Sequence, residues 1–168
     1  LGGVLNGALV TLGKIPSFIA TLGTLSIYRS LSLYMADAGT LSSSNELFRS
    51  AGSLAFLGIP LPTWCFLLLA LVFGILLKQT AYGRHICATG ANPNAARYAA
   101  IDIRRVRFGT YVLAGLAAGI AAFLFSSRLN SISSTDAGLS YELDAIAAAI
   151  IGGTAMNGGR GSIAGTVA

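Results

Sequence analysis

The chain has 168 residues, of which 54% are hydrophobic and only 10% are charged, and its mean hydropathy is +0.73. A soluble domain carries about 25% charged residues, so this composition excludes an ordinary soluble domain and also an intrinsically disordered chain. A content of only two cysteines excludes a disulfide scaffold. The chain has 11 basic and 6 acidic residues, and we expect the basic excess to mark the sides of a membrane and not to bind nucleic acid.

Two apolar segments are predicted in the N-terminal part of the chain. Residues 1–13 carry only uncharged side chains and include Gly3 and Gly7 at a small-xxx-small spacing, which predicts the end of a membrane crossing that packs closely on a neighbour. The start at Leu1, with neither methionine nor a charged leader, and the apolar end of the chain lead us to expect the middle of a longer polytopic protein.

Residues 17–36 are long enough to span a bilayer but are polar and contain Arg29 near their middle. An intramembrane arginine suggests a functional site, although snorkelling or a structural pair is easier to arrange. Thr21, Thr24 and Tyr28 carry hydroxyls that could meet a passing polyol or satisfy helix contacts. We take these three residues and Arg29 as candidates for a translocation pathway.

Two stronger crossings follow. Residues 50–77 are uncharged, and the 17 residues 61–77 would rise roughly 26 Å as a helix, close to the thickness of a hydrocarbon core. Residues 108–127 form a second uncharged run of 20 residues, in which Gly115 and Gly119 predict a packed inner helix. Residues 143–153 are apolar but too short to cross, which favours a half-helix or a re-entrant element.

The distribution of charge predicts an orientation. Residues 78–107 hold six of the 11 basic residues and one acid, so the positive-inside bias predicts that this loop is cytoplasmic. With Lys14, the inside set sums to +7 − 1 = +6. The outside set sums to +2 − 5 = −3, from Asp37, Glu46, Arg49, Arg128, Asp136, Glu142 and Asp144. The opposite signs agree with crossings that alternate.

Within the cytoplasmic loop, Asn92 followed by Pro93 predicts the N-cap and first position of a short helix that continues to about residue 99. Asp102 is then expected to cap the next membrane helix. A helix of about two turns is marginal in water and needs a surface on which to dock. The alternative is a solvated loop without a partner.

The loop sequence YGRHICATGANPNAARYAAIDIRRVR, the later GLSYELDAIAAAIIGGTAMNGGRGSIAGT and the earlier NGALVTLGKIPSFIATLGTLSIYRSL resemble the membrane permease of ribose-, xylose- and arabinose-type ABC importers. These blocks cover nearly all of the chain, about half of such a permease. The chain departs from the family at Ala100 and Ser30, where glycine is more usual, and Ala100 lies at the exit turn of the short helix.

The resemblance implies an all-α polytopic membrane protein, a multi-helix bundle of the ABC permease type that is incomplete at both ends. Residues 1–168 would form one permease domain, with residues 78–107 as its cytoplasmic coupling loop. Its short helix would dock on an ATP-hydrolysing subunit through Asn94, Ala95, Ala96, Arg97 and Tyr98. We expect Ala96→Glu to leave the permease folded but to abolish coupling, and Arg97→Ala to be milder.

The implied function is the pathway for a monosaccharide delivered by a periplasmic or extracellular binding protein, in the bacterial inner membrane. The implied partners are the ATPase, the binding protein, a second permease copy and the lipid bilayer, and the chain itself would be neither an enzyme nor a nucleic-acid binder. It would hold no cofactor, because ATP-Mg binds the partner ATPase. The alternative is a secondary transporter of small polar solutes, with broken helices and Arg29 at an ion site.

Other polar motifs carry less chemistry. Glu142 and Asp144 are two residues apart and share no helix face, so we expect Ser140 to cap their helix and the acids to lie in its first turn, with contact to sugar or binding protein as the alternative. The glycine-rich residues 152–161 lack the Lys-Ser/Thr of a P-loop and predict a tight turn. His85 is expected to be solvated, and Cys65 and Cys87 to lie too far apart to bridge.

Overall fold

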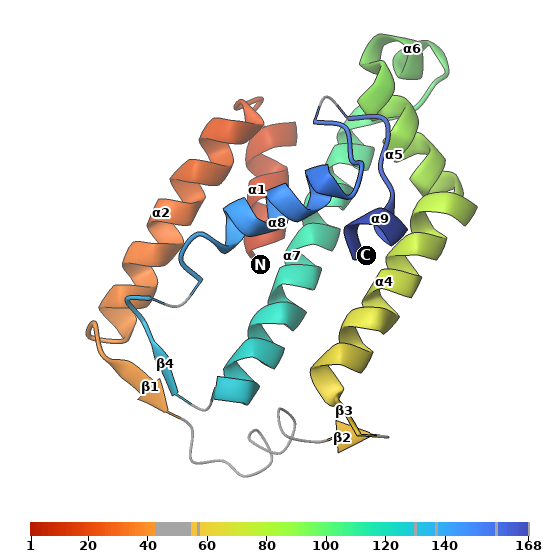
Figure 1. Ribbon diagram of the computed structural model, residues 1–168. Helices are drawn as coiled ribbons and strands as arrows, with labels where there is room; N and C mark the ends of the chain where they lie inside the picture. The colour runs from red at the N-terminus through yellow and green to blue at the C-terminus, as the bar shows by residue number, and fades with distance from the viewer. Residues whose placement is uncertain (43–54, 57, 130, 137, 157, 168) are drawn as a thin grey trace. The chain divides into compact units, whose positions relative to one another are not determined.

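The computed structural model describes residues 1–42, 55–56, 58–129, 131–136, 138–156 and 158–167 (Figure 1). The chain forms two compact units. The first comprises residues 1–66 and 111–138, and the second comprises residues 67–110 and 139–168. Glu46 and Arg49, which entered the predicted charge map, lie outside the described residues.

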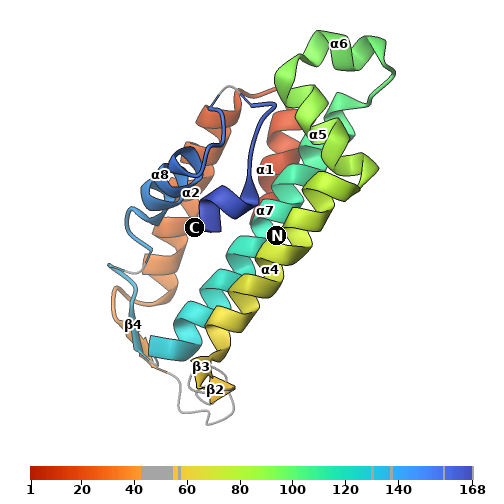
Figure 2. The ribbon, with the colours of Figure 1, turned by 45° about the vertical axis from the view of Figure 1, so that its right-hand side comes forward.

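Two long helices, α4 (Leu61–Gln79) and α7 (Ile103–Leu129), are apolar and long enough to cross a membrane (Figures 1 and 2). They confirm the helices predicted over 61–77 and 108–127. Helix α7 begins five residues earlier than the uncharged run because Asp102 caps it, as predicted. The Oδ1 atom of Asp102 accepts hydrogen bonds from the backbone N–H groups of Arg104 (3.1 Å) and Arg105 (3.2 Å).

Helices α1 (Gly2–Thr11) and α2 (Ser17–Met35) pack on each other in the first unit. Helix α2 has 19 residues, but it is not among the two described helices that are apolar enough to span. The Oγ1 of Thr24 donates a hydrogen bond to Oδ1 of Asn6 at 2.7 Å. The two segments predicted from the sequence are therefore both helical, and a polar contact joins them.

Helix α1 also approaches α7 backbone to backbone. A Cβ atom added to Gly3 would lie 2.9 Å from Cα of Gly115 and would meet the carbonyl oxygen of Tyr111. The close approach predicted for these small residues is confirmed at Gly3 and Gly115. A Cβ at Gly119 would meet no described atom within 4 Å.

Two small antiparallel pairs complete the first unit. Strand β1 (Thr40–Ser42) pairs with β4 (Ser131–Ser133), with Leu41 opposite Ile132, and β2 (Ala55–Phe56) pairs with β3 (Ile59–Pro60). The hydroxyl of Ser134 donates to the carbonyl of Gly39 at 2.8 Å and extends the first pair. Strands β1 and β4 follow the ends of α2 and α7, where the apolar runs stop, and β2 and β3 precede α4.

The second unit contains four short helices: α5 (Ala81–Ala91), α6 (Pro93–Tyr98), α8 (Tyr141–Ile151) and α9 (Ile163–Val167). The hydroxyl of Thr80 caps α5 by accepting from the N–H of Gly83 at 3.1 Å. Helices α8 and α9 pack against each other, and Gly152 touches the backbone of Thr166. Helix α8 confirms a short helical element in place of a full crossing.

The expected cap of α8 is wrong in its chemistry. Ser140 occupies the N-cap position, but its φ is 63° and its side chain makes no capping hydrogen bond. A left-handed backbone does not aim the hydroxyl at the first free N–H groups in the way that an extended N-cap does. Glu142 and Asp144 lie in the first turn as predicted, where the helix dipole favours their charge.

Candidate functional site

The short helix α6 is held at its start by the side chain of Asn92. Its Oδ1 accepts hydrogen bonds from the N–H groups of Asn94 (3.0 Å) and Ala95 (3.1 Å), and Pro93 occupies the first helical turn. The backbone of Asn92 is extended, as an N-cap requires. The predicted start of the loop helix is therefore confirmed.

The end of α6 is a Schellman motif. The N–H of Ile101 donates to the carbonyl of Ala96 and the N–H of Ala100 to that of Arg97, both at 3.0 Å. Ala100 lies in the left-handed region with φ of 58°, a conformation that costs a non-glycine residue about 1–2 kcal/mol. The departure from glycine at this position is thus accommodated without loss of the motif.

Helix α6 presents four of its five predicted coupling residues to the outside. Asn94, Ala95, Arg97 and Tyr98 are exposed, and 92% of Tyr98 is accessible. Ala96 is only 3% exposed, so it faces the chain itself. The expectation that Ala96 lies on the docking surface is wrong, because the packing of α6 on α5 covers that side of the helix.

The side chain of Tyr82 ties α5 to α7, a role that the sequence did not indicate. The Oη of Tyr82 donates to the carbonyl of Val106 at 2.9 Å, and its ring lies against Gly109. Partial burial raises the pKa of Tyr82 above its ordinary value of 10.0, because the phenolate would lose solvation. This contact fixes the base from which the loop helix projects.

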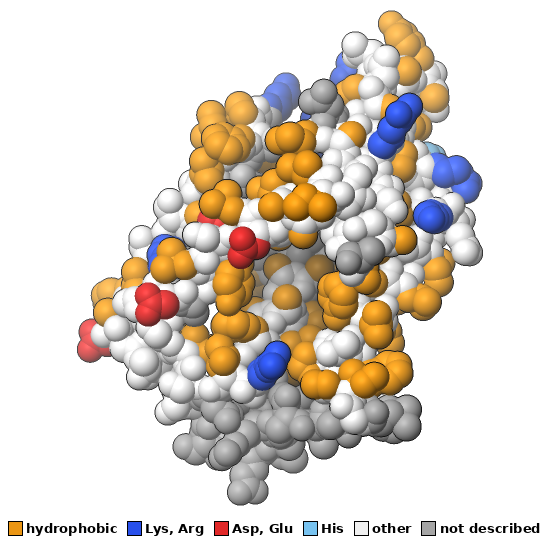
Figure 3. Space-filling model, viewed as in Figure 1, with side chains coloured by type: hydrophobic (Ala, Val, Ile, Leu, Met, Phe, Trp, Pro, Cys, Tyr) orange, Lys and Arg blue, Asp and Glu red, His pale blue; other side chains and the backbone are white. Residues whose placement is uncertain are grey.

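Basic side chains gather around α5, as Figure 3 shows together with the histidine. Arg105 forms an exposed ion pair with Asp102 at 3.0 Å. Such a pair contributes little to stability, so Asp102 acts mainly as a cap. His85 is exposed, in agreement with the solvated role expected for it.

The candidate pathway residues of α2 make contacts within the first unit. A terminal nitrogen of Arg29 donates to the carbonyl of Thr135 at 2.6 Å, which is the structural pair weighed for this residue. Thr21 donates to the carbonyl of Ser17 at 3.0 Å. Tyr28 is 40% exposed, and its ring lies beside Gly2. Arg29 and the threonines thus have structural partners.

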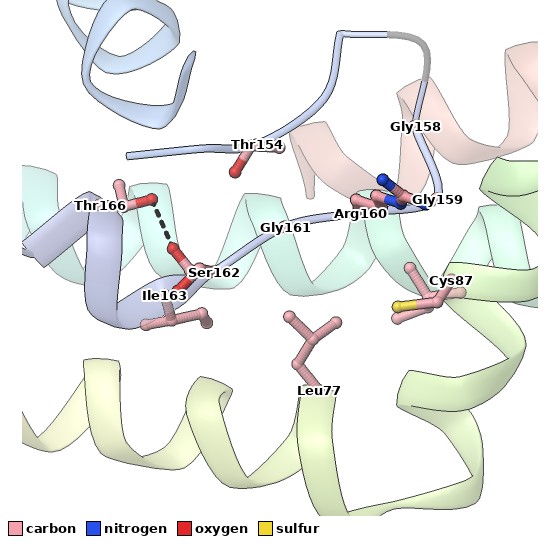
Figure 4. Close-up of a pocket in the computed structure, with 11 residues that line it drawn as sticks. Leu77, Cys87, Thr154, Gly158, Gly159, Arg160, Gly161, Ser162, Ile163 and Thr166 are labelled. Atoms are coloured by element: carbon pink, nitrogen blue, oxygen red, sulfur yellow. Dashed lines mark hydrogen bonds between the residues drawn. The ribbon is translucent and has the colours of Figure 1, made fainter. Parts of the chain in front are cut away.

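The glycine-rich segment after α8 folds against α5 and borders a cavity of about 260 Å³. Figure 4 shows Leu77 of α4 and Cys87 of α5 pointing into this pocket below the segment. Gly153, Gly158 and Gly159 have positive φ, and a Cβ on Gly159 would lie 2.6 Å from Cα of Ala91. The predicted tight turn with close backbone packing is confirmed.

Over the part of the chain that the structure describes, no three His, Cys, Asp or Glu side chains gather as a metal site would require. Cys65 and Cys87 are both free.

A family described as "Branched-chain amino acid transport system / permease component" matches residues 1–168. The chain belongs to this permease family. The family is that of a membrane subunit of transport systems, which agrees with the two apolar helices and with the largely helical fold.

Curated relatives of this permease chain are named for sugar import. The ribose import permease protein RbsC of Bacillus subtilis is 43% identical over 164 residues, which cover 96% of this chain and 51% of the relative. RbsC of Haemophilus influenzae is 37% identical, over 99% of this chain and 52% of the relative. The L-arabinose transport system permease protein AraH of Escherichia coli is 34% identical, over 97% and 49%.

The chain thus spans about half the length of the curated relatives it matches. No solved structure matches it. The predicted resemblance to monosaccharide permeases is confirmed by the family match and by the names of these relatives.

Proposed function

We propose that this permease chain forms part of the translocation pathway of an ATP-binding-cassette importer for a monosaccharide of the ribose or xylose type. The observations that support the proposal are the family match over the whole chain and relatives named for ribose and arabinose import. The chain would lie in a multi-pass bundle in the bacterial inner membrane. Residues 1–168 would belong to one permease domain of a longer protein.

The observation that carries the mechanism is the geometry of α6. Both ends of this six-residue helix are closed by hydrogen bonds, and it exposes Tyr98 almost completely. An ordered helix of about two turns with an exposed aromatic side chain suits docking on another protein, since aromatic and arginine side chains dominate the energetics of protein interfaces. A solvated loop has no comparable reason to order such a helix.

We therefore assign residues 78–107 to the cytoplasmic coupling loop and Asn94, Ala95, Arg97 and Tyr98 to the surface that meets the ATPase. The ATPase would bind ATP-Mg and hydrolyse it, and the permease would contain no cofactor. A binding protein would deliver the sugar on the opposite side, and a second permease copy, identical or different, would complete the pathway.

Thr21, Thr24, Tyr28, Arg29, Glu142 and Asp144 remain candidates for contact with the sugar along the pathway. The partners found for Arg29 and Thr24 within the chain make Tyr28 and the two acids of α8 the better candidates, because their polar atoms are available to a ligand. Weak contacts of this kind suit a pathway that must release its substrate.

The test uses the full-length permease together with its proposed partners, the ATPase and the sugar-binding protein. We expect the ATPase to co-purify, and ATP hydrolysis to rise when sugar-loaded binding protein is added to proteoliposomes. Tyr98→Ala should abolish this stimulation, whereas Arg84→Ala on α5, which removes an exposed charge outside α6, should retain it. Sugar uptake driven by an ion gradient without ATP would instead favour the secondary transporter.

A further inference from the structure

A second cavity lies in the second unit, between the C-terminal half of α5 and the first turns of α7. Its volume is about 450 Å³, and its wall includes Ile86, Thr89, Pro93, Val106, Arg107 and Thr110. This wall combines apolar side chains with one cation and two hydroxyls, and it contains no carboxylate. Such a lining suits a ligand that has both an apolar part and a negative charge.

Thr89 is the unusual member of this wall. It is 5% exposed, and its buried hydroxyl has no hydrogen-bond partner among the described residues. Other helical threonines donate to a carbonyl of the preceding turn, as Thr11 does to Gly7 at 2.6 Å and Thr110 to Arg107 at 2.7 Å. Buried polar groups normally form hydrogen bonds, so the unpaired hydroxyl of Thr89 indicates that an acceptor is missing.

Arg107 supplies the charge at the same cavity. Its side chain is exposed, and Asp102 pairs with Arg105 instead. A guanidinium binds a phosphate through two parallel hydrogen bonds, which a point charge cannot do. Arg107 and Thr89 together therefore offer donors for a phosphate oxygen, while Thr110 is held in the wall by its bond to the Arg107 carbonyl.

The position along α7 decides between a soluble phosphate and a lipid. Arg107 is the last charged residue before the 20 uncharged residues 108–127, so it lies where the helix enters the bilayer. Ile86, Pro93 and Val106 would flank the apolar part of a lipid beside its head group. Basic pockets at the cytoplasmic ends of membrane helices are suited to anionic head groups.

We propose that this cavity binds the phosphate of an anionic phospholipid through Arg107 and the hydroxyl of Thr89. The proposal depends on the proposed function in one respect, which is the assignment of residues 78–107 to the cytoplasmic side of the membrane. Pro93 of α6 forms part of the wall, so the lipid would lie directly beside the coupling helix.

The test compares phospholipids retained by the full-length permease–ATPase complex after purification from nanodiscs of phosphatidylcholine and phosphatidylglycerol in equal parts. Native mass spectrometry should show preferential retention of phosphatidylglycerol. Thr89→Val, which keeps the shape and removes the donor, and Arg107→Ala should each weaken that retention about tenfold, the effect of losing a charge-assisted hydrogen bond. Arg104→Ala, which removes an equal charge one turn earlier, should leave it unchanged.

Two results would overturn the proposal. Equal losses in Arg104→Ala and Arg107→Ala, with no loss in Thr89→Val, would indicate only general attraction to a basic surface. Displacement of phosphatidylglycerol by millimolar inorganic phosphate would indicate a soluble anion as the ligand. ATPase co-purification is scored in the same samples, so a complex that fails to assemble is distinguished from a lipid that fails to bind.

Discussion

The hydroxyl of Tyr82 donates a hydrogen bond to the carbonyl of Val106 at 2.9 Å, and this bond joins the first turn of α5 to the first turns of α7. Gly109 leaves room for the tyrosine ring, because a Cβ at that position would collide with the phenol. The segment between Tyr82 and Val106, which contains α6, is thereby closed at its base.

Tyr82→Phe removes that bond while keeping the ring. We expect a loss of about 1 kcal/mol in the free energy of unfolding, the usual value of one neutral hydrogen bond. Thermal unfolding of the purified permease measures this loss, with Tyr111→Phe as a control that alters a tyrosine of α7 in place of one of α5. An unchanged melting temperature in Tyr82→Phe would show that the bond is not maintained in the membrane protein.

The raised pKa of Tyr82 also predicts a pH dependence. A group whose pKa is higher in the folded state than in the unfolded state contributes stability that is present below the unfolded value of 10.0 and is lost as the pH rises through the folded value. The free energy of unfolding of the wild type should therefore lose its excess over that of Tyr82→Phe above about pH 10. Unfolding curves at pH 8 and pH 10.5 test this, and parallel pH profiles would contradict it.

Some of these features were predictable from the sequence because their interactions are local. Asn92 and Asp102 accept hydrogen bonds from N–H groups two and three residues away, so residue type and position suffice to identify a cap. Ser140 has the right residue type, but its backbone conformation depends on the loop before it. That information is not contained in the residues around the cap.

Other features depend on distant partners. Gly3 and Gly115 were each predictable as points of close approach, but not as partners of each other. The buried side of α6 was not predictable either, since six residues are too few for a hydrophobic period to identify the face that packs. The lack of a hydrogen-bond partner for the hydroxyl of Thr89 likewise can be recognised only when the surrounding packing is known.

The contact between α1 and α7 gives a matched pair of substitutions. Gly115→Ala would place a Cβ 2.8 Å from Cα of Gly3, and overpacking of this kind costs about 1–3 kcal/mol. Gly119→Ala on the same helix meets no described atom within 4 Å and should be neutral or stabilising by up to about 1 kcal/mol, since alanine favours helix. The melting temperature should fall in Gly115→Ala and stay the same or rise in Gly119→Ala, and equal shifts would contradict the packing.

The strained exit of α6 predicts a stabilising change. Ala100→Gly relieves the left-handed conformation, and after the larger chain entropy of glycine is subtracted we expect a gain of up to about 1 kcal/mol. Hydrogen exchange at the backbone amides of residues 100 and 101 should be slower in Ala100→Gly than in the wild type. Ala99→Gly, one residue earlier and outside the left-handed region, is the control and should not slow it.

The orientation of the chain is testable at its two cysteines. The charge distribution predicts that Cys87 is cytoplasmic and that Cys65 lies near the outer end of α4. A membrane-impermeant thiol reagent applied to intact cells should leave Cys87 unmodified, and permeabilised cells should label it because the side chain is partly exposed. Rapid labelling of Cys87 in intact cells would invert the topology and remove the assignment of the coupling loop.

The last prediction separates the two alanines of α6, which differ in burial and not in residue type. Ala95 is exposed, so Ala95→Glu should change stability by less than about 0.5 kcal/mol while placing a bulky charge on the proposed docking surface. Ala96→Glu would bury a carboxylate in the packing with α5 and should cost about 3 kcal/mol or more. We therefore expect Ala95→Glu to yield an inserted permease without substrate-stimulated ATP hydrolysis, and Ala96→Glu to reduce the folded protein itself. Membrane yield and stimulated hydrolysis distinguish these effects, with Ala95→Ser as the small exposed control. Normal stimulation in the Ala95→Glu complex would show that α6 does not couple the permease to the ATPase.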